Sequence, residues 1–69
     1  MDKLIKLIKR SMVNFGRDDF TKFLSEILDI SPSAASAKLH GDSTITADDI
    51  SLINAKLNLN PDELAEALK

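Results

Sequence analysis

Explicit helix start signals divide this chain into short helical segments, and they constrain its fold more than any other feature. Ser31-Pro32 and Asn60-Pro61 each place a side-chain acceptor before a proline, which suits the first position of a helix. Thr46 with Asp49, and Asn60 with Glu63, have the spacing of a capping box. Three helices are therefore predicted to begin near residues 31, 46 and 60, with Gly41 ending the first of them.

Two earlier helices are predicted from apolar residues at three- and four-residue spacing. One ends before Gly16, and the next follows Asp18-Asp19, whose carboxylates suit a helix N-terminus. All three phenylalanines are expected in the core. The predicted inward positions are Leu4, Leu7, Ile8 and Ser11, with Ile5 and Met12 beside them, in the first helix, Phe20, Phe23, Leu24, Ile27 and Leu28 in the second, Ile50, Ile53 and Leu57 in the fourth, and Leu64 and Leu68 in the fifth.

The size of the chain allows one core. Its 69 residues are 43% hydrophobic, and a domain this small must use nearly all its large apolar side chains in a single cluster. We therefore expect one domain spanning residues 1–69. Cysteine is absent, which excludes disulfides and favours an intracellular setting, and no apolar run is long enough for a membrane span or a signal peptide.

The residues that carry catalytic chemistry are sparse. His40 is the only histidine and has no companion at ligand spacing, so neither a metal site nor a catalytic role is expected for it, and the end of the third helix explains its position. Two adjacent acidic pairs, Asp18-Asp19 and Asp48-Asp49, lie at predicted helix starts, which accounts for both. We predict no enzyme activity, no cofactor, no metal and no small-molecule substrate.

Charge is distributed unevenly along the chain, although its net value is only -2. Residues 1–22 hold six basic and three acidic side chains, whereas residues 23–69 hold three basic and eight acidic ones. A polyanion such as DNA would be attracted to the first part and repelled by the second. This balance argues against strong unaided binding to nucleic acid.

The connection between the second and third helices is short, and a short connection makes two helices cross sharply. Residues 24–41 read Leu-Ser-Glu-Ile-Leu-Asp-Ile-Ser-Pro-Ser-Ala-Ala-Ser-Ala-Lys-Leu-His-Gly. This segment resembles the helix-turn-helix of Cro and repressor proteins from temperate phages. The resemblance implies an all-α, lambda-repressor-like domain of five short helices, with Leu24, Ala35 and Leu39 turned inward and Ser25 at the helix crossing. It also implies a bacterial, cytoplasmic regulator of transcription.

The chain departs from this family where a DNA-reading member contacts its operator. Long side chains at the start of the third helix make bidentate contacts to bases, but Pro32, Ser33 and Ala37 are too short for them. Thr21 replaces a frequent glutamine and Asp42 replaces a frequent basic residue, so contacts to phosphates are also fewer. Asp29 replaces the glycine usual in the turn and can adopt its left-handed conformation.

Two interpretations of the third helix follow. In the first, the protein is a Cro-like operator binder that binds DNA autonomously, either weakly alone or cooperatively in a mixed complex, with Lys22, Lys38, Ser33 and Ser36 contacting phosphates and bases. In the second, which we favour, the helix is a docking face for the cognate phage repressor, as in the small Cro-like modulators of repression of Gram-positive-host phages that the chain resembles. Small side chains let a partner approach closely and lose little entropy on burial.

The residues assigned to these interpretations form three groups. Those facing a partner or DNA from the third helix are Pro32, Ser33, Ala34, Ser36, Ala37 and Lys38. Those placed to contact phosphates are Thr21 and Lys22. Those expected to steer a basic partner electrostatically are Asp42, Asp48 and Asp49.

Overall fold

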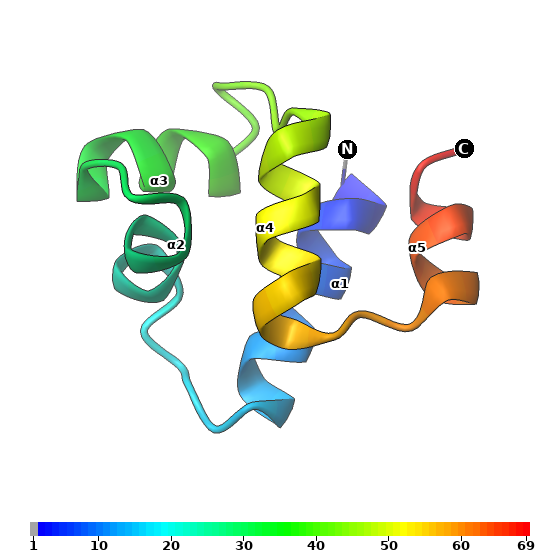
Figure 1. Cartoon of the computed structure of the whole chain (residues 1–69). Coiled ribbons are helices and arrows are strands. Elements are labelled where there is room, and N and C mark those ends of the chain that lie inside the picture. The colour runs from blue at the N-terminus through cyan, green and yellow to red at the C-terminus, as the bar shows by residue number, and fades with distance from the viewer. Residues whose placement is uncertain (1) are drawn as a thin grey trace.

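The computed structural model describes residues 2–69, and within them every regular element is an α-helix (Figure 1). This confirms the all-α prediction and the predicted number of helices. The elements are α1 (Asp2–Asn14), α2 (Phe20–Leu28), α3 (Pro32–Leu39), α4 (Ala47–Leu57) and α5 (Pro61–Ala67).

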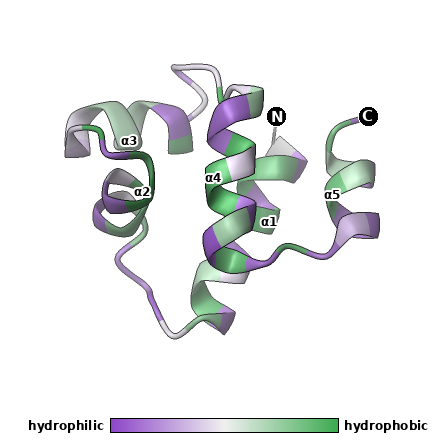
Figure 2. Cartoon of the chain, in the orientation of Figure 1, coloured by the Kyte–Doolittle hydropathy of each residue, from purple (hydrophilic) through white to green (hydrophobic). Residues whose placement is uncertain are grey.

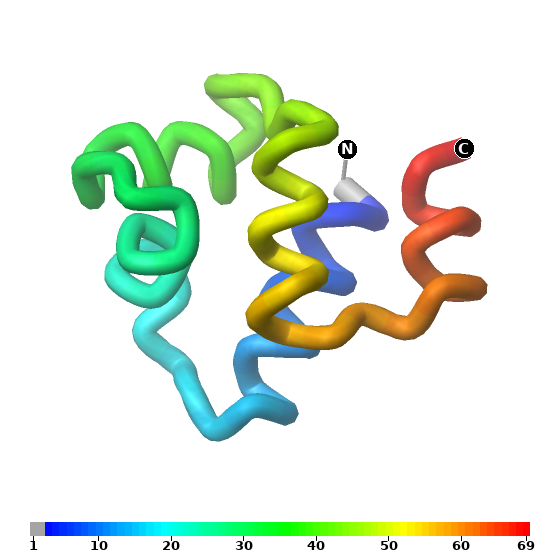
Figure 3. Tube along the Cα trace, viewed as in Figure 1, coloured from blue at the N-terminus to red at the C-terminus, as the bar shows by residue number. Residues whose placement is uncertain are grey.

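The helices are arranged around α4, which contacts both α1 and α2. Figure 3 shows the chain passing from α1 through a long connection to α2 and α3 on one side of α4, and then returning to α5 on the other side. In Figure 1, α2 is seen nearly end-on while α3 runs across it, so these two helices cross steeply. α5 packs against α1.

One hydrophobic cluster joins the helices. Figure 2 shows hydrophobic and hydrophilic residues alternating along the helices, as expected where each helix buries one face. Thirteen side chains form the core: Leu4, Ile5, Leu7, Ile8, Met12, Phe23, Leu24, Leu28, Ala35, Leu39, Ile45, Ile53 and Leu59. The positions that the family resemblance implies to be inward, Leu24, Ala35 and Leu39, are all buried.

Two of the core residues, Ile45 and Leu59, lie in connections rather than helices, and the helical periodicity did not predict them. Each comes directly before the N-cap of the next helix. Ile45 is five residues before Ile50, and Leu59 is five before Leu64, which is the spacing of a hydrophobic staple. Ile50 and Leu64 pack against the core from partly buried positions. The staple spacing is the sequence signal that indicates burial of Ile45 and Leu59.

The predicted N-caps are present, with one correction. The Ser31 side chain accepts a hydrogen bond from the backbone of Ala34 at 3.2 Å, and Thr46 forms the full capping box at the start of α4. Asn60 accepts hydrogen bonds from the first turn of α5. The capping box predicted for Asn60 is only half formed, because the carboxylate of Glu63 is directed to Arg10 on α1.

Two predicted core residues lie at the surface. Phe15 is 52% exposed because α1 ends at Asn14 and the chain turns away from the helix axis, so that the apolar stripe of α1 no longer continues. Leu68 is 53% exposed because α5 ends at Ala67, one residue earlier than the stripe requires. The spacing of apolar residues predicts a shared face only as far as the helix extends.

The turn between α2 and α3 depends on a left-handed residue. Asp29 has φ 54°, and its backbone amide donates a hydrogen bond to the carbonyl of Ser25, as predicted for an aspartate that replaces glycine here. Ile30 donates to the same carbonyl at 3.1 Å. The Ser25 side chain is buried and donates to the carbonyl of Lys22 at 2.7 Å, so its hydroxyl is hydrogen-bonded at this crossing of the two helices.

Candidate functional site

The outer surface of α3 is small and uncharged. Pro32 and Ser33 are exposed, while Ala35 and Leu39 are buried against the other helices. Between these extremes lie half-buried alanine and serine side chains. We call the outward set the α3 face; it consists of Pro32, Ser33, Ala34, Ser36 and Ala37.

Lys38, the cation predicted to contact a partner or DNA, is held within the fold. Its Nζ donates a hydrogen bond to Oδ2 of Asp49 at 2.8 Å and another to the carbonyl oxygen of Thr44 at 2.8 Å. The side chain of Lys38 is 13% exposed and that of Asp49 is 16% exposed. The pair therefore joins the end of α3 to the first turn of α4, and the ammonium group is turned away from the α3 face.

Asp49 has two structural tasks. Besides accepting from Lys38, its Oδ2 accepts a hydrogen bond from the backbone amide of Thr46 at 3.0 Å, and its own amide donates to the Thr46 hydroxyl at 3.1 Å. Burial would raise the pKa of Asp49, but the hydrogen bonds from Lys38 and Thr46 outweigh it and lower the pKa. Of the three carboxylates predicted to steer a partner, only Asp42 and Asp48 are exposed.

The C-terminal end of α3 is closed by residues that directly follow the helix. Nδ1 of His40 lies 2.8 Å from the carbonyl oxygen of Ser36 and 3.1 Å from its hydroxyl. The backbone amides of Asp42 and Ser43 donate to the carbonyl of Ala37 at 2.9 Å and 3.2 Å. These bonds engage groups that a helix leaves free at its end, so the contacts of His40 fit the structural role predicted for it.

The two residues predicted to contact phosphates lie at the start of α2. Lys22 is exposed and Thr21 is half-buried. Nearby, the Asp19 carboxylate accepts two hydrogen bonds from the guanidinium of Arg17, at 2.8 Å and 2.7 Å. These bonds lower the pKa of Asp19 to about 2, and they direct its side chain to Arg17 rather than to the amides of α2.

The basic first helix and the acidic last helix come together in the fold. Lys3, Lys6 and Arg10 of α1 line one groove of about 550 Å³ with three acidic side chains of α5, Asp62, Glu63 and Glu66. Arg10 and Glu63 form an ion pair. The positive charge that the sequence concentrates near its start is thus balanced by carboxylates from its end, which sequence spacing did not predict.

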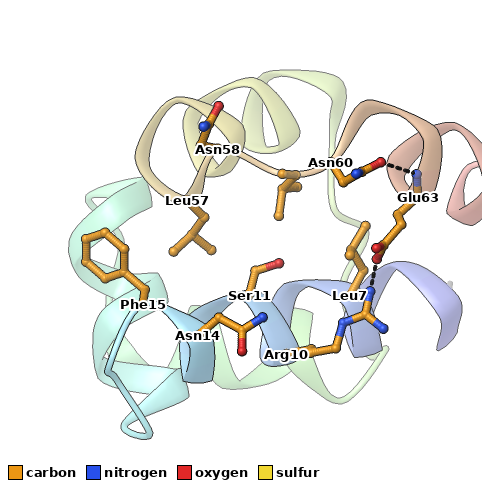
Figure 4. Close-up of a pocket in the computed structure, with 10 residues that line it drawn as sticks. Leu7, Arg10, Ser11, Asn14, Phe15, Leu57, Asn58, Asn60 and Glu63 are labelled. Carbon is orange, nitrogen blue, oxygen red and sulfur yellow. Dashed lines mark hydrogen bonds and ion pairs between the residues drawn. The ribbon is translucent and has the colours of Figure 1, made fainter.

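A smaller hollow of about 290 Å³ lies between α1 and the connection from α4 to α5 (Figure 4). Its polar groups are Ser11 and the amide side chains of Asn14, Asn58 and Asn60, and the ion pair of Arg10 with Glu63 lies at one end. Neutral amides and one ion pair can hold water or a peptide group.

Among the residues whose placement the structure describes, no group of three histidine, aspartate or glutamate side chains could hold a metal ion. Within residues 2–69, none of the helices is both long enough and apolar enough to cross a bilayer.

The fold and the site together define an all-α protein with two steeply crossed helices, of which the second presents a small, uncharged face. Comparisons of the chain with models of protein families, with curated proteins and with solved structures give no match.

Proposed function

We propose that this chain is a phage helix-turn-helix protein of the Cro and repressor type that regulates the switch between lysis and lysogeny in the bacterial cytoplasm. In this proposal α2 and α3 are the two helices of the motif. The protein acts mainly by contact with the cognate phage repressor, as an antirepressor or modulator of repression.

The main support for this proposal is that the Lys38 ammonium group donates hydrogen bonds to Asp49 and to the carbonyl of Thr44. A helix that reads DNA needs long polar or basic side chains directed to base edges and phosphates. The only basic residue of α3 instead stabilises the start of α4. The α3 face then offers a partner one exposed hydroxyl, a proline ring and alanine methyl groups.

Such a face suits docking to a protein. Alanine and serine side chains lose little conformational entropy on burial, and they allow close approach of a partner's backbone. Arginine and aromatic side chains of a repressor could supply the larger contacts that protein interfaces require. The exposed carboxylates Asp42 and Asp48, close to the end of α3, would attract a basic surface of that repressor.

The pairing of α1 with α5 supports the same function. Arg10 is engaged by Glu63, and Lys3 and Lys6 line a groove with further carboxylates of α5. A polyanion approaching α1 would therefore meet acidic groups as well as basic ones. This arrangement reduces the nonspecific attraction on which most DNA binding depends.

A titration of labelled operator DNA tests the proposal in three arms: with this protein alone, with the repressor alone, and with both. We expect no shift with the protein alone, and either loss of the repressor's shift or a new ternary complex with both. If this protein changes nothing in the third arm and does not bind the isolated repressor, the proposed function is wrong.

The α3 face is tested by bulky substitutions. Ser33→Trp changes an exposed position, and Ala37→Leu changes a half-buried one; both should abolish repressor binding, because each fills space that the partner must occupy. Ala65→Leu on α5 is the matched control and should bind normally. Circular dichroism and melting establish that the variants are folded. Unchanged affinity for Ser33→Trp would assign the contact to another surface.

The second candidate function is autonomous operator binding, and the exposed Lys22 beside the helix crossing is the observation that favours it. This function predicts a footprint of the pure protein on operator DNA. Lys22→Ala should weaken that footprint and reduce its dependence on salt by about one released counterion.

A further inference from the structure

A groove of about 440 Å³ lies between α2, α4 and the connection from α1 to α2. It is lined by Phe15 of that connection, by Phe23 and Ile27 of α2, and by Leu52 and Lys56 of α4. The groove uses the second half of α4, whereas Lys38 contacts the first turn of that helix. It is therefore separate from the α3 face.

The two aromatic side chains of the groove contact each other and the neighbouring Arg17. The rings of Phe15 and Phe23 are stacked, with centroids 5.5 Å apart and planes 21° apart. Cζ of Arg17 lies 4.3 Å from the centroid of the Phe23 ring, and Arg17 is held in turn by Asp19 and Glu26. A partner that binds here would lose little free energy in ordering these side chains.

The groove exposes large apolar side chains that the core does not cover. Phe15 is 52% exposed and Leu52 is 49% exposed. Both side chains line the same groove together with Ile27, so their exposed apolar surface lies in one place, beside the charged side chains of Arg17, Glu26 and Lys56. Covering Phe15 and Leu52 would remove apolar area from water, which favours association.

The charges at the edge of the groove indicate what covers it. Arg17 already pairs with Asp19 and Glu26, whereas Lys56 lies 5.9 Å from the Phe15 ring centroid and pairs with no carboxylate whose side chain the structure describes. Of the described residues that line the groove, Glu26 alone carries a carboxylate, and its Oε2 lies 3.5 Å from Nη2 of Arg17. Two copies joined through this groove would therefore bring no free carboxylate to Lys56.

We infer that the groove binds an amphipathic helix of another protein, with apolar side chains seated between Phe15 and Leu52 and a carboxylate beside the apolar stripe, facing Lys56. This is helix-in-groove recognition. The inference does not rest on the regulatory function proposed above, because it uses a different surface and different residues.

The test uses the full chain and two synthetic helical peptides. Both peptides carry leucine at helical spacing; one has glutamate beside the stripe and the other has lysine at the same position. Affinity is measured by fluorescence anisotropy, and the binding surface is mapped by amide chemical shifts. We expect shifts at Phe15 and Leu52, and about threefold tighter binding of the glutamate peptide, the size expected for one exposed ion pair.

Three variants sharpen the test. Leu52→Ser should weaken binding about tenfold, whereas Leu68→Ser, which changes an equally exposed leucine outside the groove, should not change it. Lys56→Glu should reverse the preference between the two peptides, and it alters an exposed residue; circular dichroism and melting check that this variant is folded.

Three results would overturn the inference. The first is a set of shifts outside the groove, and the second is equal binding of both peptides to the natural chain and to Lys56→Glu. The third is self-association that Leu52→Ser abolishes, because this would assign the groove to a second copy.

Discussion

The ion pair of Lys38 with Asp49 can be tested by Asp49→Asn. The substitution removes the charge from an oxygen that accepts from the Lys38 ammonium at 2.8 Å and from the Thr46 amide at 3.0 Å. It also leaves Lys38, whose side chain is 13% exposed, without a counter-ion. Both effects destabilise the junction between α3 and α4.

The expected decrease in the free energy of unfolding lies between two limits. An exposed ion pair contributes about 0–1 kcal/mol, whereas breaking a fully buried one costs about 3–5 kcal/mol. The side chains of Lys38 and Asp49 are both mostly buried, and the substitution also weakens the capping box of α4. We therefore expect the free energy of unfolding to fall by about 2 kcal/mol. A domain of this length has a free energy of unfolding of about 3–10 kcal/mol, so the midpoint of thermal unfolding should fall by about 10 °C.

Urea denaturation at pH 7, followed by circular dichroism, measures this loss. Asp48→Asn is the matched control, because Asp48 lies in the same turn but is exposed; it should cost about 0.5 kcal/mol through the helix dipole. The double variant Lys38→Met with Asp49→Asn should be more stable than Asp49→Asn alone, because the uncompensated ammonium is gone. Equal losses for Asp48→Asn and Asp49→Asn, or strictly additive losses in the double variant, would refute the role of the pair.

Three other predictions concern separate features. Asp29→Gly should stabilise the protein by about 0.5–1 kcal/mol in the same urea assay, because glycine adopts the left-handed conformation of this turn without a Cβ clash. The folded-state pKa of Asp19 is lowered from 3.8 to about 2, so the ionised carboxylate stabilises the folded protein above pH 4, and this stabilisation is lost as the pH falls towards 2. Asp19→Asn should therefore make the free energy of unfolding depend less on pH in this range, as measured by acid titration. The double variant Asp42→Lys with Asp48→Lys should associate more slowly with a basic repressor, and its association rate should depend less on salt. Association rates from stopped-flow measurements that change with neither the substitutions nor the salt concentration would contradict electrostatic steering.

The parts of the fold that could be predicted from the sequence are those governed by neighbours in the chain. Helix starts follow from a cap and its partner three residues on, which is why Ser31 and Thr46 mark α3 and α4 correctly. The same local reasoning fails at Glu63, because a distant arginine competes successfully for its carboxylate. It fails at Phe15 as well, because the stripe of α1 ends with the helix.

The candidate site was predictable in composition but not in geometry. The short side chains of the α3 face are visible in the sequence. The position of the Lys38 ammonium is not, since its partner is eleven residues away on another helix. Residue spacing describes faces of one helix, whereas an ion pair between helices depends on how those helices pack. For the same reason the groove beside Leu52 could not be predicted, because α2, α4 and the α1–α2 connection form it together.

Charges that are separated along the sequence are partly paired with one another in the folded chain. Taken along the sequence, a basic beginning and an acidic remainder suggest one part that attracts DNA and another that repels it. In the structure, α1 and α5 are neighbours and Arg10 pairs with Glu63, so much of that contrast is balanced internally. Asp49 is balanced by Lys38 in the same way. The exposed carboxylates near the end of α3 are then Asp42 and Asp48, and a partner that docks on the α3 face would meet them at its edge. A basic, DNA-binding surface of a repressor has the complementary charge for that edge, whereas DNA itself does not.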